Sequence, residues 1–433
     1  MSPPVDHVRG DAAMPARTSV VVIGGGIVGV STALFLAQKG IPVVLCEKGE
    51  IGAEQSSRNW GWTRVMGRDV REIPLGMESL RLWRGMNALT GRETGFRQSG
   101  IVYLCETRTE MEQRETWLEE ARPFQLDSRA LAPDEIEAVL PGSARPWAGA
   151  LYTPSDGRAE PSQAAPAIAE AARALSATIL TGCAVRGIET KAGRVGGVVT
   201  ERGRIDCDSV VLAGGAWSRL FAGNIGINLP LLKILGSVMR TQPIAGPEVA
   251  AGGGRFAFRK RLDGGYNVSQ RNASTADITP DSFRQFFDFL PSLKTSWHEL
   301  RLRMGPRFVE EWKIPRRWGM DETTPFERMR VLDPAPVGRT LRQAREALAA
   351  AFPVFAGMQA QASWGGLIDV TPDAVPVISA VDALPGFFLA AGFSGHGFGI
   401  GPGAGKLAAD LVSGDTPAVD PEPYRFGRFA QAK

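Results

Sequence analysis

Two glycine-rich loops near opposite ends of this sequence carry the residue types best suited to chemistry. The first, 24–29, has glycine at the three positions of a G-x-G-x-x-G and follows the apolar run 20–23. Glycines in such a turn let the backbone approach a pyrophosphate, and the N-terminus of the next helix stabilises its negative charge. A second apolar run, 41–46, ends at Glu47, where an acid can accept a hydrogen bond from a ribose hydroxyl. This unit predicts that the chain binds an adenine dinucleotide, whereas the alternative is an ordinary strand–helix–strand unit with a glycine-rich turn.

The second loop indicates which dinucleotide the chain binds. It spans 392–403, follows the apolar run 386–391 and leads into a helical pattern at 404–412. One of the three histidines of the chain, His396, lies within it. A simple NAD-dependent dehydrogenase does not need a second glycine loop. A flavoprotein uses one, because a helix N-terminus stabilises the negative charge of the reduced flavin ring. FAD is therefore favoured over NAD.

Composition limits the remaining classes. The 433 residues are enough for two domains, or for one large domain with an insertion. A net charge of +3 argues against a nucleic-acid binder, and no apolar run is long enough for a transmembrane helix. We expect residues 1–17 to be a disordered leader and not a signal peptide. The four cysteines lack C-x-x-C or metal-ligand spacing, which predicts buried reduced thiols, no metal site and a reducing cytoplasm.

The elements that must position these loops can be read from periodicity. Alternating patterns at 184–189, 195–201 and 203–207 predict a three-stranded antiparallel meander, and 209–213 predicts a buried strand that returns to a parallel sheet. Other strands are expected at 100–105, 178–182, 233–241, 255–261 and 266–269, and helices at 30–39, 72–89, 106–140 and 164–175. The turn at 263–265 predicts a hairpin between two of these strands.

The segment 229–352 differs from the rest because it is rich in arginine and aromatic residues. Within it, 281–303 places aromatic and leucine side chains at helical spacing. We favour core packing for this stripe. The alternative is contact with a membrane surface or a quinone reductase, because several arginines follow closely. These are Arg301, Arg303, Arg307, Arg316 and Arg317.

Several motifs together resemble one enzyme family. They are the first glycine motif, Ala-Gly-Gly-Ala-Trp at 213–217, Thr-Pro-Asp-Ala-Val-Pro-Val-Ile at 371–378 and Gly-Phe-Ser-Gly-His-Gly-Phe at 392–398. The set resembles the D-amino-acid oxidase family of FAD enzymes, and more narrowly its glycine oxidase, sarcosine oxidase and D-amino acid dehydrogenase branch. The loop 56–62 resembles that of bacterial D-amino acid dehydrogenase-like members. The resemblance covers nearly the whole chain past residue 19.

The resemblance implies a mixed α/β and α+β architecture with a glutathione-reductase-type FAD fold. A discontinuous, Rossmann-like FAD-binding domain would comprise 18–95, 150–228 and 355–425. An antiparallel-sheet substrate domain would comprise 96–149 and 229–354.

It also implies the cofactor-binding residues. These would be Ile23, Gly24, Gly26, Ile27, Val28, Gly29, Glu47, Lys48, Ser56, Ser57, Arg58, Asn59, Trp60, Gly61, Trp62, Val185, Ala213, Gly214, Gly215, Trp217, Gly392, Gly395, His396, Gly397, Phe398, Gly399 and Ile400.

Two departures from sarcosine oxidases stand out. Those enzymes carry a carboxylate-binding lysine directly after Gly-His-Gly-Phe, where this chain has Gly399. They also attach the flavin through a C-terminal cysteine, and no cysteine follows Cys207 here. We therefore expect non-covalent FAD and a substrate pocket unlike that of a sarcosine oxidase.

The family reaction moves a hydride from the α-carbon to flavin N5, and the imine product then hydrolyses. Because the cofactor supplies this chemistry, no catalytic triad is needed. An arginine fork would match a substrate carboxylate. Candidate catalytic and substrate residues are His396, Arg64, Arg68, Tyr266, Arg259, Arg261 and Trp364. For the arginines the alternative is a surface or ion-pair role, and for Tyr266 and Trp364 it is core packing.

We therefore expect an FAD-dependent amine oxidoreductase acting on a D-amino acid or an N-substituted amino acid of the opine or imino-diacid type. Oxygen or a quinone would reoxidise the flavin. The protein would be cytoplasmic, with peripheral contact to the inner membrane face as an option. The alternatives are an FAD-dependent 2-hydroxy-acid oxidoreductase, a non-catalytic flavin-binding redox module and an NAD-linked dehydrogenase.

Overall fold

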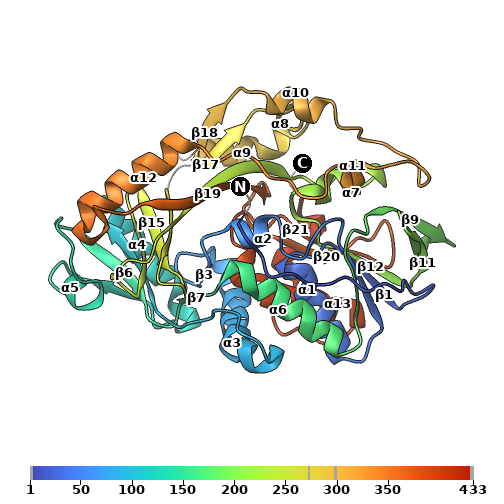
Figure 1. Ribbon diagram of the computed structural model, residues 1–433, viewed down its shortest axis with the longest axis horizontal. Coiled ribbons are helices and arrows are strands. Elements are labelled where there is room, and N and C mark those ends of the chain that lie inside the picture. The colour runs from blue at the N-terminus through green and yellow to red at the C-terminus, as the bar shows by residue number, and fades with distance from the viewer. Residues whose placement is uncertain (1–2, 272–273, 297–299, 430–433) are drawn as a thin grey trace.

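The computed structural model describes residues 3–271, 274–296 and 300–429, and its described strands form two large sheets (Figure 1). The first sheet has six strands in the order β20-β21-β12-β1-β2-β8, and only β20 runs antiparallel to its neighbour. Its strands are β1 (Val20–Ile23), β2 (Val43–Cys46), β8 (Thr178–Leu180), β12 (Ser209–Leu212), β20 (Val377–Ala380) and β21 (Phe387–Ala391). Their continuous apolar runs fit a parallel sheet covered on both faces.

Four helices share one core on one face of this sheet and bring the two ends of the chain together. Helix α1 follows β1 directly and packs against both α13 and α6, while α13 also packs on α3. The helices are α1 (Ile27–Gln38), α3 (Ile73–Thr90), α6 (Pro161–Ala174) and α13 (Gly397–Ser413). Close packing of α1 on α13 depends on Gly405, because a Cβ there would lie 2.4 Å from the Cβ of Ser31. Thus both glycine loops end at helices that touch each other.

The expected three-stranded meander is present as β9 (Val185–Lys191), β10 (Arg194–Thr200) and β11 (Gly203–Asp206). It follows β8 and leads back into β12, at the centre of the six-stranded sheet. Three short helices complete this part of the fold. Helix α7 (Ser218–Asn224) follows β12, α11 (Pro325–Arg328) contacts β9 through Glu327 and Arg186, and α2 (Gln55–Arg58) packs against α6 and β19.

The second sheet is larger and mostly antiparallel, and the expected hairpin joins two of its strands, β15 and β16. Its long central pair, β13 and β19, runs across the molecule toward the first sheet (Figure 1). The strands are β4 (Ile101–Cys105), β5 (Arg129–Leu131), β6 (Gly149–Thr153), β13 (Leu232–Thr241), β14 (Ala250–Gly253), β15 (Phe256–Lys260), β16 (Tyr266–Ser269), β17 (Ser274–Asp277), β18 (Leu300–Arg303) and β19 (Ala360–Val370). Helix α12 (Gly338–Ala351) covers one face over a core that includes Phe256, Phe258 and Phe352.

A two-stranded ribbon joins the loop after α2 to the segment before α6. It consists of β3 (Trp62–Thr63) and β7 (Gly157–Arg158). Two strands near the expected domain boundaries, β6 and β19, belong to the larger sheet although they fall in segments assigned from sequence to the FAD-binding domain. The domain limits therefore remain predictions. Assigning β6 and β19 to the substrate domain would place both strands with the sheet to which they belong.

The prediction of one continuous helix over 106–140 was wrong. Helix α4 (Arg108–Ala121) is followed by a 3₁₀ turn at 122–124, by β5 and by the short α5 (Ile136–Val139). Pro123 lies in that turn, and Gln125 adopts a left-handed conformation with a φ of 52°. Both features end a helix, because proline lacks an amide hydrogen and the left-handed residue reverses the chain.

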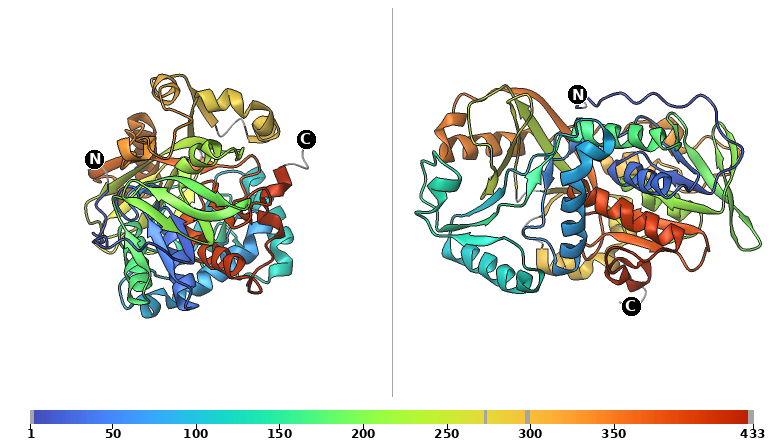
Figure 2. Two further views of the ribbon diagram at one scale, coloured as in Figure 1. Left: turned by 90° about the vertical axis from the view of Figure 1, so that its right-hand side faces the viewer. Right: turned by 90° about the horizontal axis from the view of Figure 1, so that it is seen from below.

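The expectation of a disordered leader at 1–17 is also corrected for the residues that the structure describes. Residues 3–17 run along the edge of the first sheet and its helices (Figure 2). The Asp6 amide donates to the Ser162 carbonyl at 3.0 Å, and the Asp11 amide donates to the Ile179 carbonyl at 2.7 Å. Val8 is buried in the core around α1 and α6. These contacts attach the segment along its length.

The stripe at 281–303 does not form one core helix. It is divided into α8 (Pro280–Arg284), α9 (Phe286–Ser296) and strand β18, which lie with α10 (Arg307–Trp312) at one edge of the molecule (Figure 1). Phe289 is buried, but Phe283 is 64% exposed and Phe287 is 84% exposed. Core packing was therefore the wrong expectation for the exposed part of the stripe. Trp297, one of its aromatic members, lies outside the described residues, as does His298.

Candidate active site

The carboxyl ends of β1, β2 and β12 open into a long pocket with an empty volume of about 1250 Å³. The first glycine turn forms its floor, and φ of +109° at Gly24 explains why glycine is needed there. At Gly29 a Cβ would lie 1.9 Å from the Gly24 carbonyl oxygen. The turn thus exists only with these glycines, and it leaves the start of α1 facing the pocket.

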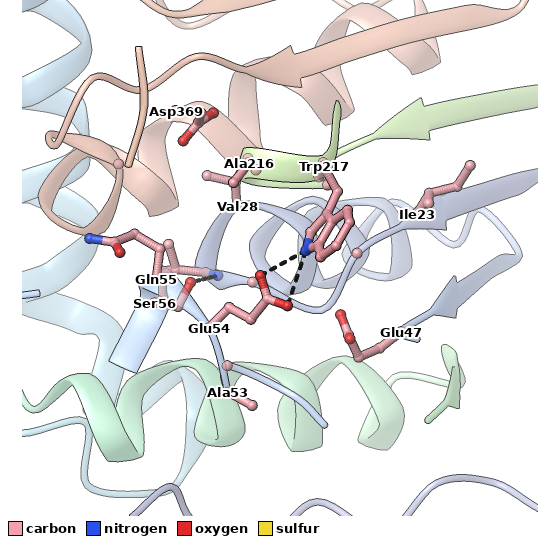
Figure 3. Close-up of a pocket in the computed structure, with 18 of the residues that line it drawn as sticks. Ile23, Val28, Glu47, Ala53, Glu54, Gln55, Ser56, Ala216, Trp217 and Asp369 are labelled. Atoms are coloured by element: carbon pink, nitrogen blue, oxygen red, sulfur yellow. Dashed lines mark hydrogen bonds between the residues drawn. The ribbon is translucent and has the colours of Figure 1, made fainter. Parts of the chain in front are cut away.

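The N-terminus of α1 provides donors for an anion. No side chain caps this helix at Gly26, and the Ile27 amide donates to Ser56 Oγ at 2.8 Å (Figure 3). The backbone amides of its first turn and the helix dipole therefore face the space where Gly26 and Val28 line the pocket. This is the geometry that binds a pyrophosphate.

Glu47 lies at the end of β2 beside the same turn. Its carboxylate accepts from the Gly25 amide and from the Gly49 amide, each at 2.7 Å. Burial raises the pKa of Glu47, while Lys48 and these amides act in the opposite direction. Each carboxylate oxygen has a second lone pair, so the side chain is held rigidly and can still accept from ribose hydroxyls.

A polar pair that the sequence analysis did not identify lies deeper in the pocket. The Trp217 indole donates to both carboxylate oxygens of Glu54, at 3.0 and 3.1 Å (Figure 3). Lys48 Nζ lies 2.6 Å from Glu54 Oε1 and 4.8 Å from the centre of the Trp217 ring. The sequence marked Trp217 and Lys48 separately, but nothing in the spacing of Glu54 linked it to them.

Asp369, at the end of β19, holds the second glycine loop and was also missed. Its carboxylate accepts from the Gly392 amide at 2.6 Å, and its backbone carbonyl accepts from the Ser394 amide at 2.8 Å. Burial raises the pKa of Asp369. The side chain lines the pocket beside Gly395, and so it joins the larger sheet to the loop that faces the pocket.

His396 begins α13 and faces a buried acid. Its Nδ1 lies 3.1 Å from Glu72 Oε2. Burial and the nearby Arg68 lower the pKa of His396 to about 4, although Glu72 acts in the opposite direction. The imidazole is therefore neutral at physiological pH. The pKa of Glu72 is lowered as well, because His396 and Arg68 outweigh the effect of burial.

The absence of a lysine at position 399 has a steric reason in this fold. A Cβ on Gly399 would lie 2.9 Å from the Trp62 carbonyl oxygen and 3.2 Å from the Thr63 Cα. The Gly399 carbonyl accepts from Ser79 Oγ and from Trp83 Nε1, each at 2.8 Å. Strand β3 thus packs directly on α13, and a side chain at 399 has no room.

Beyond this contact lies a cluster of four arginines around Tyr103, which we call the arginine cluster: Arg64, Arg68, Arg114 and Arg271. The guanidinium carbons of Arg271, Arg114 and Arg64 lie 3.8, 5.4 and 5.5 Å from the centre of the Tyr103 ring. Burial, followed by the charge of Arg64, lowers the pKa of Arg68 to about 9. In the part of the chain that the structure describes, no carboxylate lies within 4.0 Å of any of the four guanidinium groups.

The sequence analysis identified Arg64 and Arg68 but missed Arg114 and Arg271. Arg114 lies on α4, in a charged helix with many arginine and glutamate residues, and Arg271 follows β16. Neither position carried a signal in the sequence. Only the fold brings Arg114 from α4 and Arg271 from the segment after β16 to the same tyrosine ring.

The other expected substrate residues are engaged elsewhere, which corrects their assignment. Arg259 is fully buried and its Nη1 lies 2.7 Å from Glu160 Oε1, while Arg261 Nε lies 3.1 Å from Asp263 Oδ2. Tyr266 donates to the Pro247 carbonyl at 2.9 Å within the core under α12. Trp364 donates to the Arg58 carbonyl at 3.2 Å. These four side chains stabilise the fold around the site and are not free to bind substrate.

Most of the expected cofactor residues converge on the pocket. Those that line it are Ile23, Gly24, Gly26, Ile27, Val28, Glu47, Lys48, Ser56, Asn59, Val185, Ala213, Gly214, Gly215, Trp217, Gly395, Gly397 and Phe398. The others do not line it. Arg58, for example, is buried in an ion pair with Asp333 at 2.6 Å. The remaining members of that second group are Gly29, Ser57, Trp60, Gly61, Trp62, Gly392, His396, Gly399 and Ile400.

Comparison with known proteins agrees with this geometry. The family model described as "FAD dependent oxidoreductase", named DAO, matches residues 19–411. The chain belongs to this family. Its FAD chemistry follows from that membership, and the uncapped helix starts, the glycine turn and Glu47 form a site that fits FAD.

Two solved structures are particularly similar to this chain. L-amino acid deaminase from Proteus myxofaciens, in complex with anthranilate, has 33% sequence identity and a TM-score of 0.94, covering 99% of this chain and 98% of that one. L-amino acid deaminase from Proteus vulgaris has 31% identity and a TM-score of 0.92, covering 97% and 99%.

Curated relatives are more distant. Glycine oxidase from Pseudomonas putida is 26% identical, covering 94% of this chain and 97% of that protein. Mouse mitochondrial dimethylglycine dehydrogenase is 25% identical over 95% of this chain, but the chain spans only 44% of its length.

Proposed function

We propose that this protein oxidises the C–N bond of an α-amino acid, with either a free or an N-substituted amine. The observation that carries the proposal is the position of the arginine cluster. The cluster adjoins the second glycine loop at two points. Arg68 lies close enough to His396 to lower its pKa, and Gly399 packs on β3 next to Arg64. An unpaired arginine at this position suits a substrate carboxylate.

FAD, when bound, accepts the two electrons of the oxidation, and the residues of this chain bind and orient both molecules. The first turn of α1 would hold the pyrophosphate, Glu47 the ribose, and the first turn of α13 the ring. No cysteine follows Cys207, so we propose that the cofactor is bound without a covalent bond.

The positive charge near the second glycine loop suits an amine oxidation. The substrate must react as the unprotonated amine, and a cation beside it repels an ammonium but not a free amine. The arginine cluster favours the carboxylate and disfavours an ammonium in the same way. The site therefore selects the protonation state that the reaction requires.

The sequence resemblance led us to expect a D-amino acid or an N-substituted one. The two solved structures described above, at 33 and 31% identity, are L-amino acid deaminases. This directs our proposal toward the L series, with oxidation to an imine that water converts to an oxo acid and an amine.

The test is anaerobic mixing of the FAD-loaded protein with matched L-, D- and N-methyl amino acids and with 2-hydroxy acids, followed by flavin absorption. We expect bleaching by amino acids, and ammonia or methylamine as a product. Bleaching by hydroxy acids alone would overturn the proposal. Later admission of air or of a soluble quinone identifies the electron acceptor.

We also propose that the exposed apolar patch formed by α8, α9 and α10 touches a membrane surface, where a quinone would be reached. Phe283, Phe287 and Trp312 are 64, 84 and 68% exposed, and Arg284 on α8 and Arg307 on α10 lie on the same helices. Aromatic residues flanked by arginines suit an anionic lipid surface. None of the described helices is long and apolar enough to cross a membrane.

Co-sedimentation with vesicles of anionic phospholipid tests this contact. Phe287→Ser with Phe283→Ser should abolish binding, while Leu175→Ser, at a 45% exposed leucine near the end of α6, should leave it unchanged. Equal binding by the double variant and the native protein would contradict the membrane contact.

A further inference from the structure

The arginine cluster carries more positive charge than one substrate carboxylate can balance. Three guanidinium groups lie over the Tyr103 ring and that of Arg68 lies nearby, and the acids whose charges act on Arg68 are Glu72 and Asp156. Glu72 is already occupied by His396. Asp156 accepts from the Val65 and Met66 amides, and burial raises its pKa to about 7. Neither acid lies within salt-bridge distance of an arginine in the cluster, so an excess of cations remains.

Two buried nitrogens in the cluster lack a hydrogen-bond partner. They are Arg68 Nη1 and Arg114 Nε, and the Arg68 side chain as a whole is only 3% exposed. Leaving a buried cationic donor unsatisfied is costly unless a ligand pairs with it. Because two such donors come from different elements, one on the loop after β3 and one on α4, they indicate two separate places for anionic oxygen atoms.

The cluster has an inner and an outer side. Arg68 and Arg64 adjoin the glycine loop through His396 and Gly399. Arg271 packs beside the Trp62 ring, since a Cβ on Gly252 would touch both side chains. Arg114 reaches the cluster from α4, on the second sheet, and contacts Tyr103 and Cys105. A substrate whose reacting carbon lies at the glycine loop would thus extend toward Arg114.

We propose that the preferred substrate is a dianion, an amino acid with a second acidic group on its side chain or on its nitrogen, and that Arg114 is the residue that selects for this second group. The inference rests on the proposed function for the position of the α-carboxylate. Arg68, Arg64 and Arg271 hold that carboxylate at the inner side. Arg114 pairs with the distal acid, which replaces the missing partner of its Nε.

The first test measures binding without turnover. Glutarate and pentanoate have the same chain length, and only glutarate has two carboxylates. Calorimetric titration of the FAD-loaded protein should show glutarate binding roughly 10- to 100-fold more tightly, as a charge-assisted hydrogen bond would provide. Equal affinities, or tighter binding of pentanoate, would overturn the proposal whether or not any amino acid is oxidised.

The second test assigns the residue. In Arg114→Met the glutarate-to-pentanoate affinity ratio should fall to near 1, and in Arg114→Lys it should fall part of the way because a single point charge remains. Arg108→Met, at an exposed arginine of the same helix, is the matched control and should keep the native ratio. A native ratio in Arg114→Met would contradict the role of Arg114.

The third test uses turnover and separates this inference from the proposed function. Glutamate should reduce the flavin with a kcat/KM roughly 10- to 100-fold above that of glutamine, which has the same shape without the charge. Rapid reduction by glutamine and leucine with slow reduction by glutamate would overturn the dianion proposal while the oxidation of amino acids stands. Reduction by no amino acid would overturn the proposed function, and the calorimetric titration would still decide the dianion proposal.

Discussion

Nδ1 of His396 and Oε2 of Glu72 lie 3.1 Å apart, so the N-cap residue of α13 contacts the buried carboxylate of the N-cap residue of α3. His396 is 24% exposed and Glu72 only 1%. Burial and Arg68 nevertheless lower the pKa of the imidazole, so the contact is a hydrogen bond between a neutral ring and a charged acid at neutral pH.

This contact predicts how stability depends on pH. The pKa of His396 is lowered from 6.5 to about 4, so between these values the unfolded chain binds a proton that the folded chain does not. The free energy of unfolding should therefore rise with pH over that window, by up to about 1.4 kcal/mol per pH unit from this residue. Denaturant unfolding at several pH values should show a weaker slope in His396→Asn. His7→Asn, at an exposed histidine, is the control and should keep the native slope.

Gly399 should tolerate no side chain. Gly399→Ala places a Cβ 2.9 Å from the Trp62 carbonyl oxygen, so strand β3 or helix α13 must move, at a cost of about 1–3 kcal/mol. Gly85→Ala is the matched control, because it lies within α3 with no atom near its Cβ, and it should stabilise the protein by about 0.5–1 kcal/mol. If thermal unfolding shows both variants equally stable, the packing of β3 on α13 is not as described.

Glu47 should control FAD affinity. Glu47→Gln keeps the shape of the side chain but loses the charge, and an amide nitrogen that can only donate replaces one of the two oxygens that face the Gly25 and Gly49 amides. Loss of one or two charge-assisted hydrogen bonds corresponds to an FAD affinity about 10- to 100-fold weaker. Fluorescence titration of the apoprotein with FAD measures it. Glu120→Gln, at an exposed glutamate of α4, should bind FAD as the native protein does.

Arg259 should affect stability and not substrate binding. Arg259→Met removes the main ion-pair partner of the buried Glu160 and leaves it the Leu262 amide and Arg261 at 3.9 Å, which costs about 3–5 kcal/mol of unfolding free energy. Changing Glu160 to Met as well should recover part of the loss. Arg108→Met breaks only exposed ion pairs and should cost no more than about 1 kcal/mol. A raised KM with unchanged stability in Arg259→Met would contradict this account and indicate that Arg259 binds substrate.

The cofactor half of the site was predictable because it depends on local sequence. The glycine turn, the helix after it and Glu47 are close in the chain, and their spacing is dictated by the pyrophosphate and ribose they would hold. The second loop was predictable for the same reason. Even so, Asp369 and Glu54 were missed, since each acts through a contact that only the tertiary fold creates.

The substrate half was not predictable. Arg259 and Arg114 both lie in polar or mixed sequence. Their neighbours along the chain do not show whether the guanidinium group forms an ion pair or has no carboxylate beside it. The difference arises from distant partners: Glu160 lies opposite Arg259, whereas Tyr103 lies opposite Arg114. The stripe at 281–303 failed similarly, because helical spacing alone does not reveal whether another element covers that face.

The central claim is that the two glycine loops form one FAD site at which an amino acid is oxidised. Anaerobic titration of the purified, FAD-loaded protein with L-amino acids, followed through the flavin absorption band, tests it most directly. We predict one FAD per chain and complete bleaching by at least one amino acid, with an oxo acid as product. A protein that cannot be loaded with FAD, or a loaded protein that no amino acid bleaches, would contradict the account.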